Sequence, residues 1–138
     1  MTNDCIFCKI VKGELPSYKV YEDEKVLAFL DIKPANYGHI LVIPKEHYNN
    51  ILDIDEEDLI ALISACKKIS SVIASVLEPD GINILQSNNP AAGQVINHFH
   101  IHIIPRNQQD NVHFEWTPHT LEKSQFEELA KKLREEIE

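Results

Sequence analysis

The sequence has few cysteines, few cationic side chains and no strongly apolar run of membrane-spanning length. Its three cysteines are an odd number, and Met1-Thr2-Asn3-Asp4 lacks the basic and apolar segments of a secretory leader. Both observations disfavour a framework of disulfide bonds. The most apolar run, Ile40 to Ile43, is far too short to cross a bilayer. We therefore expect a cytoplasmic protein with reduced thiols and no membrane partner.

Basic residues are also scarce. Acidic side chains outnumber basic ones by 22 to 13, which gives a formal net charge of −9. A surface that binds nucleic-acid backbone needs clustered Lys and Arg, so we expect no nucleic-acid partner. A small anionic substrate remains compatible with this charge if its pocket is locally favourable. The 138 residues suit a single domain with one core.

Hydrophobic periodicity predicts five strands and two main helices. Strands are expected at 18–21, 25–30, 39–43, 82–86 and 95–104. A long helix is expected from Glu56 to Leu77, capped by Asp53 or Asp55. A short helical turn is expected at 5–12 and a last helix at 121–137. This order predicts the α+β class, with helices covering a mainly antiparallel five-stranded sheet.

The stretch 97–105 alternates histidine with a large apolar residue. At the period of a β-strand, His98, His100 and His102 share one face, and the intervening Phe and Ile residues share the other. Histidine can act as a base, an acid, a nucleophile or a metal ligand near neutral pH. Three histidines in register therefore indicate either a metal-binding comb or a nucleophile with helper groups.

Cys5 and Cys8 form a C-x-x-C pair. Two thiolates at this spacing can bind one metal ion, although the second pair of a zinc finger is missing from the sequence. The alternative is a pair of reduced cysteines at a helix start. Cys66 lies in the long helical pattern and is expected to be a small core residue.

Three segments together resemble the histidine triad (HIT) family: the triple-histidine segment 93–106 with its preceding Gly-Gln, the segment 38–47 and the segment 28–34. The resemblance runs from about Cys5 to Arg106. It implies the histidine triad fold in one domain, residues 1–138, with a core at 5–106 and a variable C-terminal segment at 107–138. Members are nucleotide hydrolases and transferases, usually homodimers, so a homodimer is implied here.

The resemblance also implies roles for three histidines. His100 matches the nucleophile that attacks the α-phosphorus of a nucleoside 5′-phosphoramidate or related AMP conjugate and forms a covalent nucleotidyl-histidine. His102 matches the position that contacts the phosphate and the leaving group. His39 matches a fourth histidine that supports the hydrogen-bond network; the alternative is a surface histidine at a strand start.

The implied nucleotide pocket has two parts. Asp31 would accept hydrogen bonds from ribose hydroxyls, with Phe29 and Ile32 beside the base; alternatively, Asp31 only caps the turn before Pro34. The loop before the histidines would surround the phosphates with amide donors, with contacts from Ser87, Asn88, Gly93, Gln94 and Val95. Val95 stands where a Ser or Thr is common in the family, so only its backbone N–H is expected to donate.

The resemblance further implies that His47 and His98 complete a zinc site with Cys5 and Cys8. A Cys2His2 set is closed and tetrahedral, which makes the zinc structural rather than catalytic. It would tie the N-terminal segment to the histidine stretch. Trp116 in the C-terminal segment can help to shape the site, whereas His113 and His119 receive no role.

Two classes of function follow. The first is an enzyme that hydrolyses purine nucleoside phosphoramidates or related AMP conjugates, with dinucleoside polyphosphates as the alternative substrate. The second is a nucleotide- or metal-binding module without significant turnover, of which an interaction protein with a disused pocket is a further variant.

Overall fold

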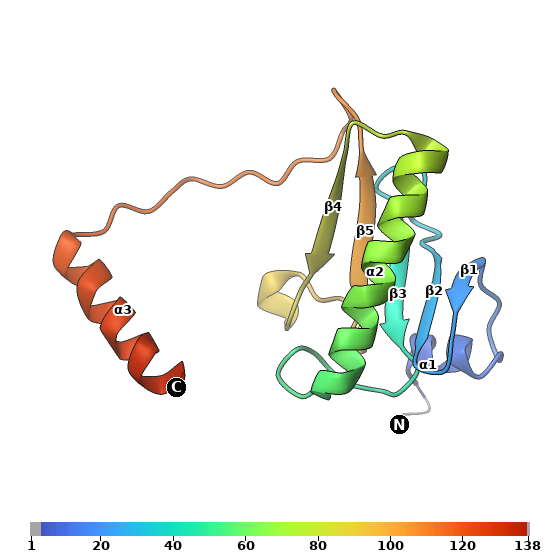
Figure 1. The fold of residues 1–138 in the computed structure, drawn as a ribbon, viewed down its shortest axis with the longest axis horizontal. Helices are drawn as coiled ribbons and strands as arrows, with labels where there is room; N and C mark the ends of the chain where they lie inside the picture. The colour runs from blue at the N-terminus through green and yellow to red at the C-terminus, as the bar shows by residue number, and fades with distance from the viewer. Residues whose placement is uncertain (1–3, 138) are drawn as a thin grey trace.

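The computed structural model describes residues 4–137; Met1 to Asn3, on which the expectation about a secretory leader was based, lie outside the described residues, as does Glu138. The elements follow the expected order (Figure 1). They are α1 (Ile6–Val11), β1 (Lys19–Glu22), β2 (Val26–Leu30), β3 (Ile40–Pro44), α2 (Glu56–Leu77), β4 (Gly81–Gln86), the 3-10 turn η1 (Pro90–Ala92), β5 (Ile101–Arg106) and α3 (Lys123–Ile137).

The five strands form one sheet in the order β1-β2-β3-β5-β4, and every neighbouring pair is antiparallel. The predicted α+β class with a mainly antiparallel five-stranded sheet is therefore confirmed. The order places β5, which carries the end of the histidine stretch, between β3 and β4. It leaves β4 as one edge of the sheet.

α2 covers one face of the sheet (Figure 1). Leu62, Cys66 and Ile69 of this helix pack in one buried cluster with Val42 of β3 and Ile101 of β5. Cys66 is thus a core residue, as expected. Asp55 holds the N-cap position of α2 without a side-chain hydrogen bond to the helix, so the acidic first turn acts through the helix dipole.

By length and composition, α2 is the one helix within residues 4–137 that could cross a membrane. Its apolar residues are nevertheless divided between a buried face against the sheet and an outer face that carries the exposed Lys67 and Lys68. This division is typical of a core helix lying on a sheet.

The opposite face of the sheet carries a second buried cluster. Phe7 and Cys8 of α1 pack there against Leu27, Phe29 and Leu41. Because β3 contributes alternate residues to both clusters, all five of its residues are buried. The sequence predicted burial on both sides of this strand, and the structure confirms it.

The histidine stretch differs from the expected strand at 95–104, because the ladder begins only at Ile101. Ile101 pairs with the last residue of β4 and with Val42 of β3, and no strand partner continues upstream. The N–H of Phe99 instead donates to the carbonyl of Tyr48 at 2.7 Å. The alternation survives, since Phe99 faces α2 while the rings of His98 and His100 meet Phe7 on the other face.

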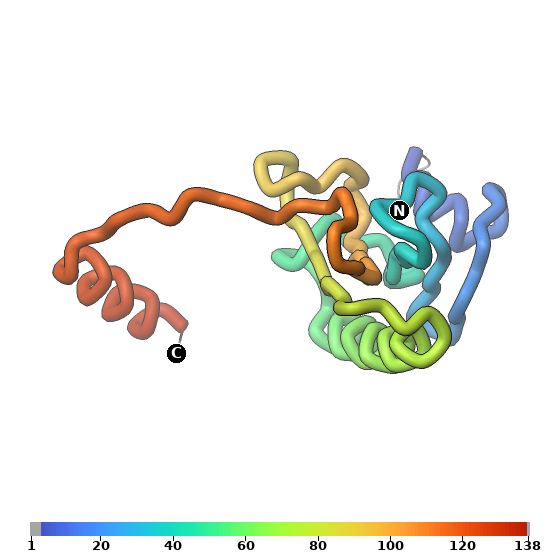
Figure 2. Tube along the Cα trace, turned by 90° about the horizontal axis from the view of Figure 1, so that it is seen from above, coloured from blue at the N-terminus to red at the C-terminus, as the bar shows by residue number. Residues whose placement is uncertain are grey.

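The expected C-terminal helix forms as α3, but it does not cover the sheet. The chain leaves β5, runs in an irregular extended stretch from Asn111 to Glu122, and carries α3 away from the other elements (Figures 1 and 2). None of the described residues of α3 is buried.

Candidate functional site

The histidines converge on the face of the sheet opposite α2. His102 on β5 lies directly across from Leu41 of β3, and His39 immediately precedes β3. The rings of His100 and His102 have centroids 5.0 Å apart, and those of His39 and His102 are 5.1 Å apart. His39 and His100 are both buried. The sheet therefore brings together the three histidines to which catalytic roles were predicted.

The backbone fixes the tautomer of His100. Its Nδ1 lies 2.7 Å from the carbonyl oxygen of His98, and a carbonyl can only accept. In the neutral ring the proton therefore sits on Nδ1 and is donated to His98, which leaves Nε2 with a free lone pair. A neutral imidazole with one free nitrogen is the form required of a nucleophile near pH 7.

A second chain of hydrogen bonds fixes the tautomer of His102. The N–H of Ala35 donates to Nδ1 of His39 at 2.9 Å, so the neutral His39 ring carries its proton on Nε2. Nε2 lies 2.9 Å from Nδ1 of His102 and donates to it. The proton of neutral His102 is thereby left on Nε2, where it is available as a donor to a ligand.

Burial lowers the pKa of His39 and of His100 below the ordinary histidine value. The pKa of His102 is lowered to about 4, first by burial and then by the neighbouring His100 and His39. The carboxylate of Asp31 opposes these shifts without cancelling them. All three rings are therefore neutral at pH 7, which is the state assumed by the two hydrogen-bond chains.

Of the residues predicted to contact the nucleoside, Asp31 lies close to these rings. Asp31 Oδ2 lies 3.6 Å from Nε2 of His39, and Oδ1 of the same carboxylate accepts from the N–H of Lys33 at 2.8 Å. Asp31 therefore caps the turn and faces the histidines at once, so the two alternatives for it are compatible. Phe29 is buried edge-on against Phe7, whereas Ile32 is exposed and free to contact a ligand.

The loop before the histidine stretch is held by its own side chains. Gln94 is buried, donates to the carbonyls of Asn49 and Ile96, and accepts from the N–H of Asn89. Asn88 exchanges hydrogen bonds with Gln86 and accepts from the N–H of Ile51. The side-chain amides of Asn88 and Gln94 are thus engaged within the protein, so the predicted contacts of this loop with a phosphate would have to come from backbone N–H groups.

The loop backbone at Gly93 and Val95 is open to its surroundings. Gly93 has φ +97°, in the left-handed region that glycine adopts without strain, and its missing side chain leaves open space beside the loop. Val95 is 90% exposed, so its N–H belongs to an accessible segment. Ser87 also lies in this loop, directly after β4.

The four predicted metal ligands come together although they are up to 93 residues apart in the sequence. Nδ1 of His98 lies 3.3 Å from Sγ of Cys5, 3.6 Å from Sγ of Cys8 and 3.2 Å from Nδ1 of His47. Sγ of Cys8 lies 3.2 Å from Nδ1 of His47. All four atoms are within 4.8 Å of one another, so the set could hold a metal ion.

The donor chemistry of this cluster fits zinc. Nε2 of His98 donates to the carbonyl of Pro44 at 2.9 Å, which leaves its Nδ1 unprotonated and turned towards the sulfurs. Without a cation, burial raises the pKa of the Cys8 thiol to about 11. A bound metal ion would instead favour the thiolate form of Cys8, because thiolate and neutral imidazole are the ligands that a structural zinc takes.

A second group of possible metal ligands comprises Asp31, His39 and His102. Its ring nitrogens are already joined by the Ala35–His39–His102 chain of hydrogen bonds, so we assign it to hydrogen bonding. His100 belongs to neither group. Among the described residues, His98 alone of the three histidines lies in the cysteine cluster, which favours the nucleophile interpretation over the metal-binding comb.

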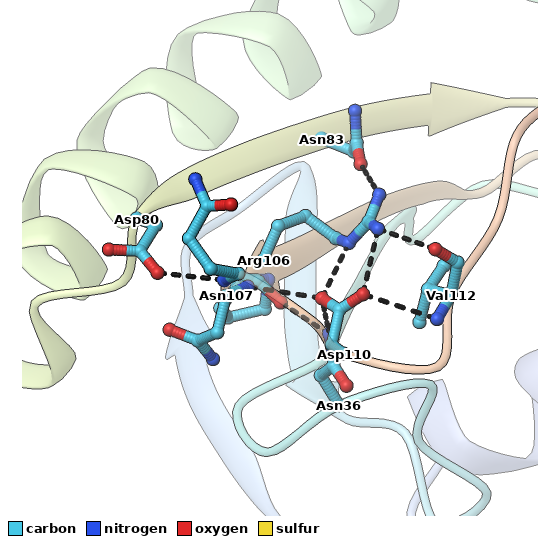
Figure 3. Close-up of polar contacts among 9 residues, drawn as sticks. Asn36, Asp80, Asn83, Arg106, Asn107, Asp110 and Val112 are labelled. Atoms are coloured by element: carbon cyan, nitrogen blue, oxygen red, sulfur yellow. Dashed lines mark hydrogen bonds and ion pairs between the residues drawn. The ribbon is translucent and has the colours of Figure 1, made fainter.

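Sequence reasoning missed the support beneath the site. Arg106 donates to both carboxylate oxygens of Asp110 and to Asn83 (Figure 3). Asp110 also accepts from Asn36 in the loop before His39. This network ties the end of β5 to the loop that carries Ala35, and it keeps the pKa of the Asp110 carboxyl well below its usual range through the Arg106 guanidinium. A cation four residues before an acid was the only signal in the sequence.

The C-terminal candidates do not reach the site within one chain. Trp116 is 81% exposed in the extended stretch. His113 lies near Arg106, beside a separate polar cavity, and His119 is exposed further along. The structure therefore places none of these three side chains beside His100.

Comparisons with known proteins find a matching family model and several relatives of this chain. A family model described as a HIT domain matches residues 12–109. An uncharacterized HIT-like protein of Borreliella burgdorferi is 46% identical over 94% of this chain and 96% of its own. An adenosine 5′-monophosphoramidase of Candida albicans is 36% identical over 96% and 91%. An adenylylsulfatase of Arabidopsis thaliana is 46% identical over 80% of this chain and 56% of its own.

Solved structures show the same fold. The Streptococcus mutans protein SMU.412c superposes with a TM-score of 0.94 at 43% identity, covering 100% of this chain and 88% of its own. A HIT family protein of Bacillus anthracis gives 0.93 at 38% identity, covering 100% of both chains. A Zn-bound histidine triad family protein of Mycobacterium smegmatis gives 0.76 at 34% identity, covering 98% of both. The TM-scores of the first two structures are too high to arise from residues 4–110 alone. Residues 111–137 therefore superpose on these structures as well.

Proposed function

Because this chain belongs to the histidine triad family, we propose that it hydrolyses AMP conjugates at the α-phosphate, with nucleoside 5′-phosphoramidates as the substrate class. A hydrolase is supported at the general level by the family and by its named monophosphoramidase and adenylylsulfatase members. The observation that carries the specific proposal is the free Nε2 of His100, whose other nitrogen is committed to the carbonyl of His98.

The proposed reaction has two steps. Nε2 of His100 attacks the α-phosphorus, the P–N bond of the phosphoramidate breaks, and the departing NH2 group takes up a proton from water; the hydroxide that this leaves later neutralises the proton that the attacking water releases in the second step. The new imidazolium keeps its Nδ1–H on the carbonyl of His98, which stabilises the positive charge. Water then attacks the phosphorus of the nucleotidyl-histidine, releases AMP and restores neutral His100.

His102 acts in this scheme as a preorganised donor. Its Nε2–H faces the ligand side because Nδ1 accepts from His39. A hydrogen bond from this group to a phosphoryl oxygen or to the leaving atom stabilises charge that develops in the transition state. Backbone N–H groups of the loop at Gly93 and Val95 are the proposed donors to the remaining phosphoryl oxygens, and Asp31 is the proposed acceptor for the ribose.

We further propose that zinc occupies the Cys5, Cys8, His47 and His98 cluster and has a structural role. The Zn-bound Mycobacterium smegmatis relative and the donor set of this chain support the proposal. A homodimer, a purine nucleotide as the ligand and a cytoplasmic location complete it, on the basis of the family and of the composition.

The decisive measurement is AMP release from adenosine 5′-phosphoramidate by the native protein and by His100→Ala. Loss of the nucleophile should lower the rate by about 10³-fold or more. His113→Ala is the matched control, because this histidine lies outside the site, and it should keep native activity. Circular dichroism checks that each variant is folded.

Each result has a defined meaning. If His100→Ala is as active as the native protein, the covalent mechanism is wrong. If the native protein binds AMP but does not hydrolyse adenosine 5′-phosphoramidate, the binding-module interpretation replaces the enzyme interpretation.

A further inference from the structure

The peptide group between His98 and Phe99 is hydrogen-bonded at both ends. Its carbonyl oxygen accepts from Nδ1 of His100 at 2.7 Å, and its N–H donates to the carbonyl oxygen of Tyr48 at 2.7 Å. A peptide group is planar and rigid, so the bond made by its N–H also fixes the direction of its carbonyl oxygen. The position of Tyr48 therefore bears on the acceptor that sets the tautomer of His100.

The contact with Tyr48 stands where a strand pairing is missing. Within the described residues, β5 pairs with both of its neighbours only from Ile101 onwards. Because β3 and β5 are antiparallel, the connection from β3 to α2, residues 45–55, leaves the sheet at the end where β5 begins (Figure 1). Phe99 is fully buried, and a buried N–H without a partner is costly. The carbonyl of Tyr48 supplies this partner from the connection.

The side chain of Tyr48 is fixed to the start of α2. Its hydroxyl donates to Oδ2 of Asp58 at 2.6 Å, and this carboxylate lies in the first turn of the helix. Nζ of Lys25, directly before β2, lies 3.4 Å from the other carboxylate oxygen. Asp58 is buried, and hydrogen bonds to charged groups are stronger than those between neutral groups. The helix and the start of β2 thus hold residue 48 in place.

The residue after Tyr48 holds the same stretch by separate bonds. The carbonyl of Asn49 accepts from the side-chain amide of Gln94 at 2.6 Å, and Oδ1 of Asn49 accepts from Asn97 at 3.0 Å. These bonds fix the path of the stretch, whereas Tyr48 contacts the peptide group itself. Loss of the Tyr48 hydroxyl should therefore loosen this peptide group while the loop stays folded.

We propose that Tyr48 is a positioning residue for His100: its phenol, held by Asp58, keeps its carbonyl on the peptide group that orients the His100 ring. This role rests on the proposed function, because His100 is the nucleophile there. A peptide group that donates through its N–H is also a better acceptor at its oxygen, since hydrogen bonds in a chain polarise one another. Tyr48 packs with the cluster beneath α2, so it acts from the face opposite the histidine rings.

The test compares three substitutions in the full chain with zinc present. Tyr48→Phe removes the hydroxyl and keeps the ring, Asp58→Leu removes the acceptor, and Asp58→Asn keeps an oxygen that can accept from Tyr48. Tyr21→Phe is the matched control. The hydroxyl of Tyr21 also donates to an aspartate, Asp23, at 2.7 Å, but it lies on β1, which β2 and β3 separate from β5. Circular dichroism checks that each variant is folded.

Two readouts follow the peptide group and the ring without any nucleotide. The ¹⁵N shifts of labelled histidine at pH 8 report which nitrogen of His100 carries the proton, and amide hydrogen exchange reports the bond from Phe99 to Tyr48. The native protein should carry this proton on Nδ1 and protect the Phe99 amide. Tyr48→Phe and Asp58→Leu should speed the exchange by about 10-fold or more and populate the second tautomer. Asp58→Asn and Tyr21→Phe should leave both readouts native.

The third readout is the hydrolysis of adenosine 5′-phosphoramidate. Tyr48→Phe should lower kcat by about 10-fold with KM nearly unchanged, because a misaligned nucleophile affects the transition state more than it affects substrate binding. The double variant with Asp58→Leu should lose no more than either single variant, because the two side chains act as one unit. Asp58→Asn should stay near the native kcat.

Three results would overturn the proposal. The first is a native tautomer of His100 with native exchange of the Phe99 amide in Tyr48→Phe. The second is an equal effect of Tyr21→Phe on these readouts. The third is a lower melting temperature of Tyr48→Phe with kcat unchanged, which is the result of a purely structural role. An inactive native protein would instead refute the proposed hydrolysis, and the tautomer and exchange readouts would still decide the role of Tyr48.

Discussion

Nδ1 of His100 donates a 2.7 Å hydrogen bond to the carbonyl oxygen of His98, and the ring of His98 lies in the cysteine cluster. Two residues of backbone thus connect the proposed nucleophile to the proposed metal site. A shift of the His98 ring moves the acceptor that holds the tautomer of His100. The proposed structural metal and the proposed nucleophilic nitrogen are therefore expected to be coupled.

Removal of the metal should lower stability and activity together. Cys8→Ser should lose the stoichiometric zinc, lower the melting temperature and reduce AMP release, because the cluster no longer holds His98. Elemental analysis and thermal unfolding measure the first two effects. Cys66→Ala is the control, since this cysteine is a core residue remote from the cluster, and it should retain one zinc per chain. Native protein purified without chelator and found free of zinc would contradict the assignment.

His39 should act as a positioning residue for His102. His39→Ala removes the donor to Nδ1 of His102, so the proton of His102 can move to the wrong nitrogen. We expect kcat to fall by about 10²-fold, the lower end of what a positioned acid–base group contributes. His39→Gln keeps an N–H that can donate to His102 and should retain more activity. Equal losses in the two variants would show that packing, not the tautomer, is what His39 supplies.

The buried histidines should make the protein less stable in acid. Burial lowers the pKa of His102 to about 4, so the unfolded chain takes up a proton near pH 6.5 while the folded chain does not. His102 therefore costs no stability above pH 6.5. Below that pH, the free energy of unfolding falls as the pH drops towards about 4.

The measurement is denaturant unfolding between pH 8 and pH 4 at saturating zinc, for the native protein and for His102→Gln. The variant cannot charge at this position, so the native protein should lose stability relative to it across this interval. Parallel curves for the two proteins would contradict the prediction.

Gly38 should tolerate no side chain. It has φ +92°, and a Cβ built there would lie 2.5 Å from Cδ1 of Leu77. Gly38→Ala should cost about 1–3 kcal/mol of unfolding free energy through backbone strain and the clash. It should also weaken activity, because the strained residue adjoins His39. Gly13→Ala separates the two causes, since φ is +80° there but no atom lies within 4 Å of the added Cβ. Equal losses at both positions in denaturant unfolding would rule out the clash.

Local sequence patterns predicted most of the secondary structure. The 3.6-residue period of α2 and the run of β3 are properties of contiguous residues, so both elements formed at the expected places. The strand through His98 and His100 was placed too early, because alternation reports which way side chains point but not where a partner strand ends. The absence of a ladder partner before Ile101 is a tertiary fact.

The site shows the same division. The spacing of the histidines and of Cys5 and Cys8, together with the family resemblance, predicted which side chains lie together in the two clusters. The engagement of Asn88 and Gln94 within the loop could not be read from the sequence, because their partners Ile51 and Asn49 lie about 40 residues away. The same holds for the Arg106–Asp110–Asn36 network, which forms only when β5 ends beside the loop before β3.

The sequence by itself determined the α+β class and the family, and it indicated which histidines to propose as reactive, since these depend on residue type and short-range order. Tertiary structure decided which nitrogen of each imidazole is free, because the acceptors and donors that fix the tautomers, the carbonyl of His98 and the amide of Ala35, are placed by backbone geometry. It also decided that α3 leaves the sheet uncovered, because an amphipathic pattern specifies that a face must be buried but not which chain buries it.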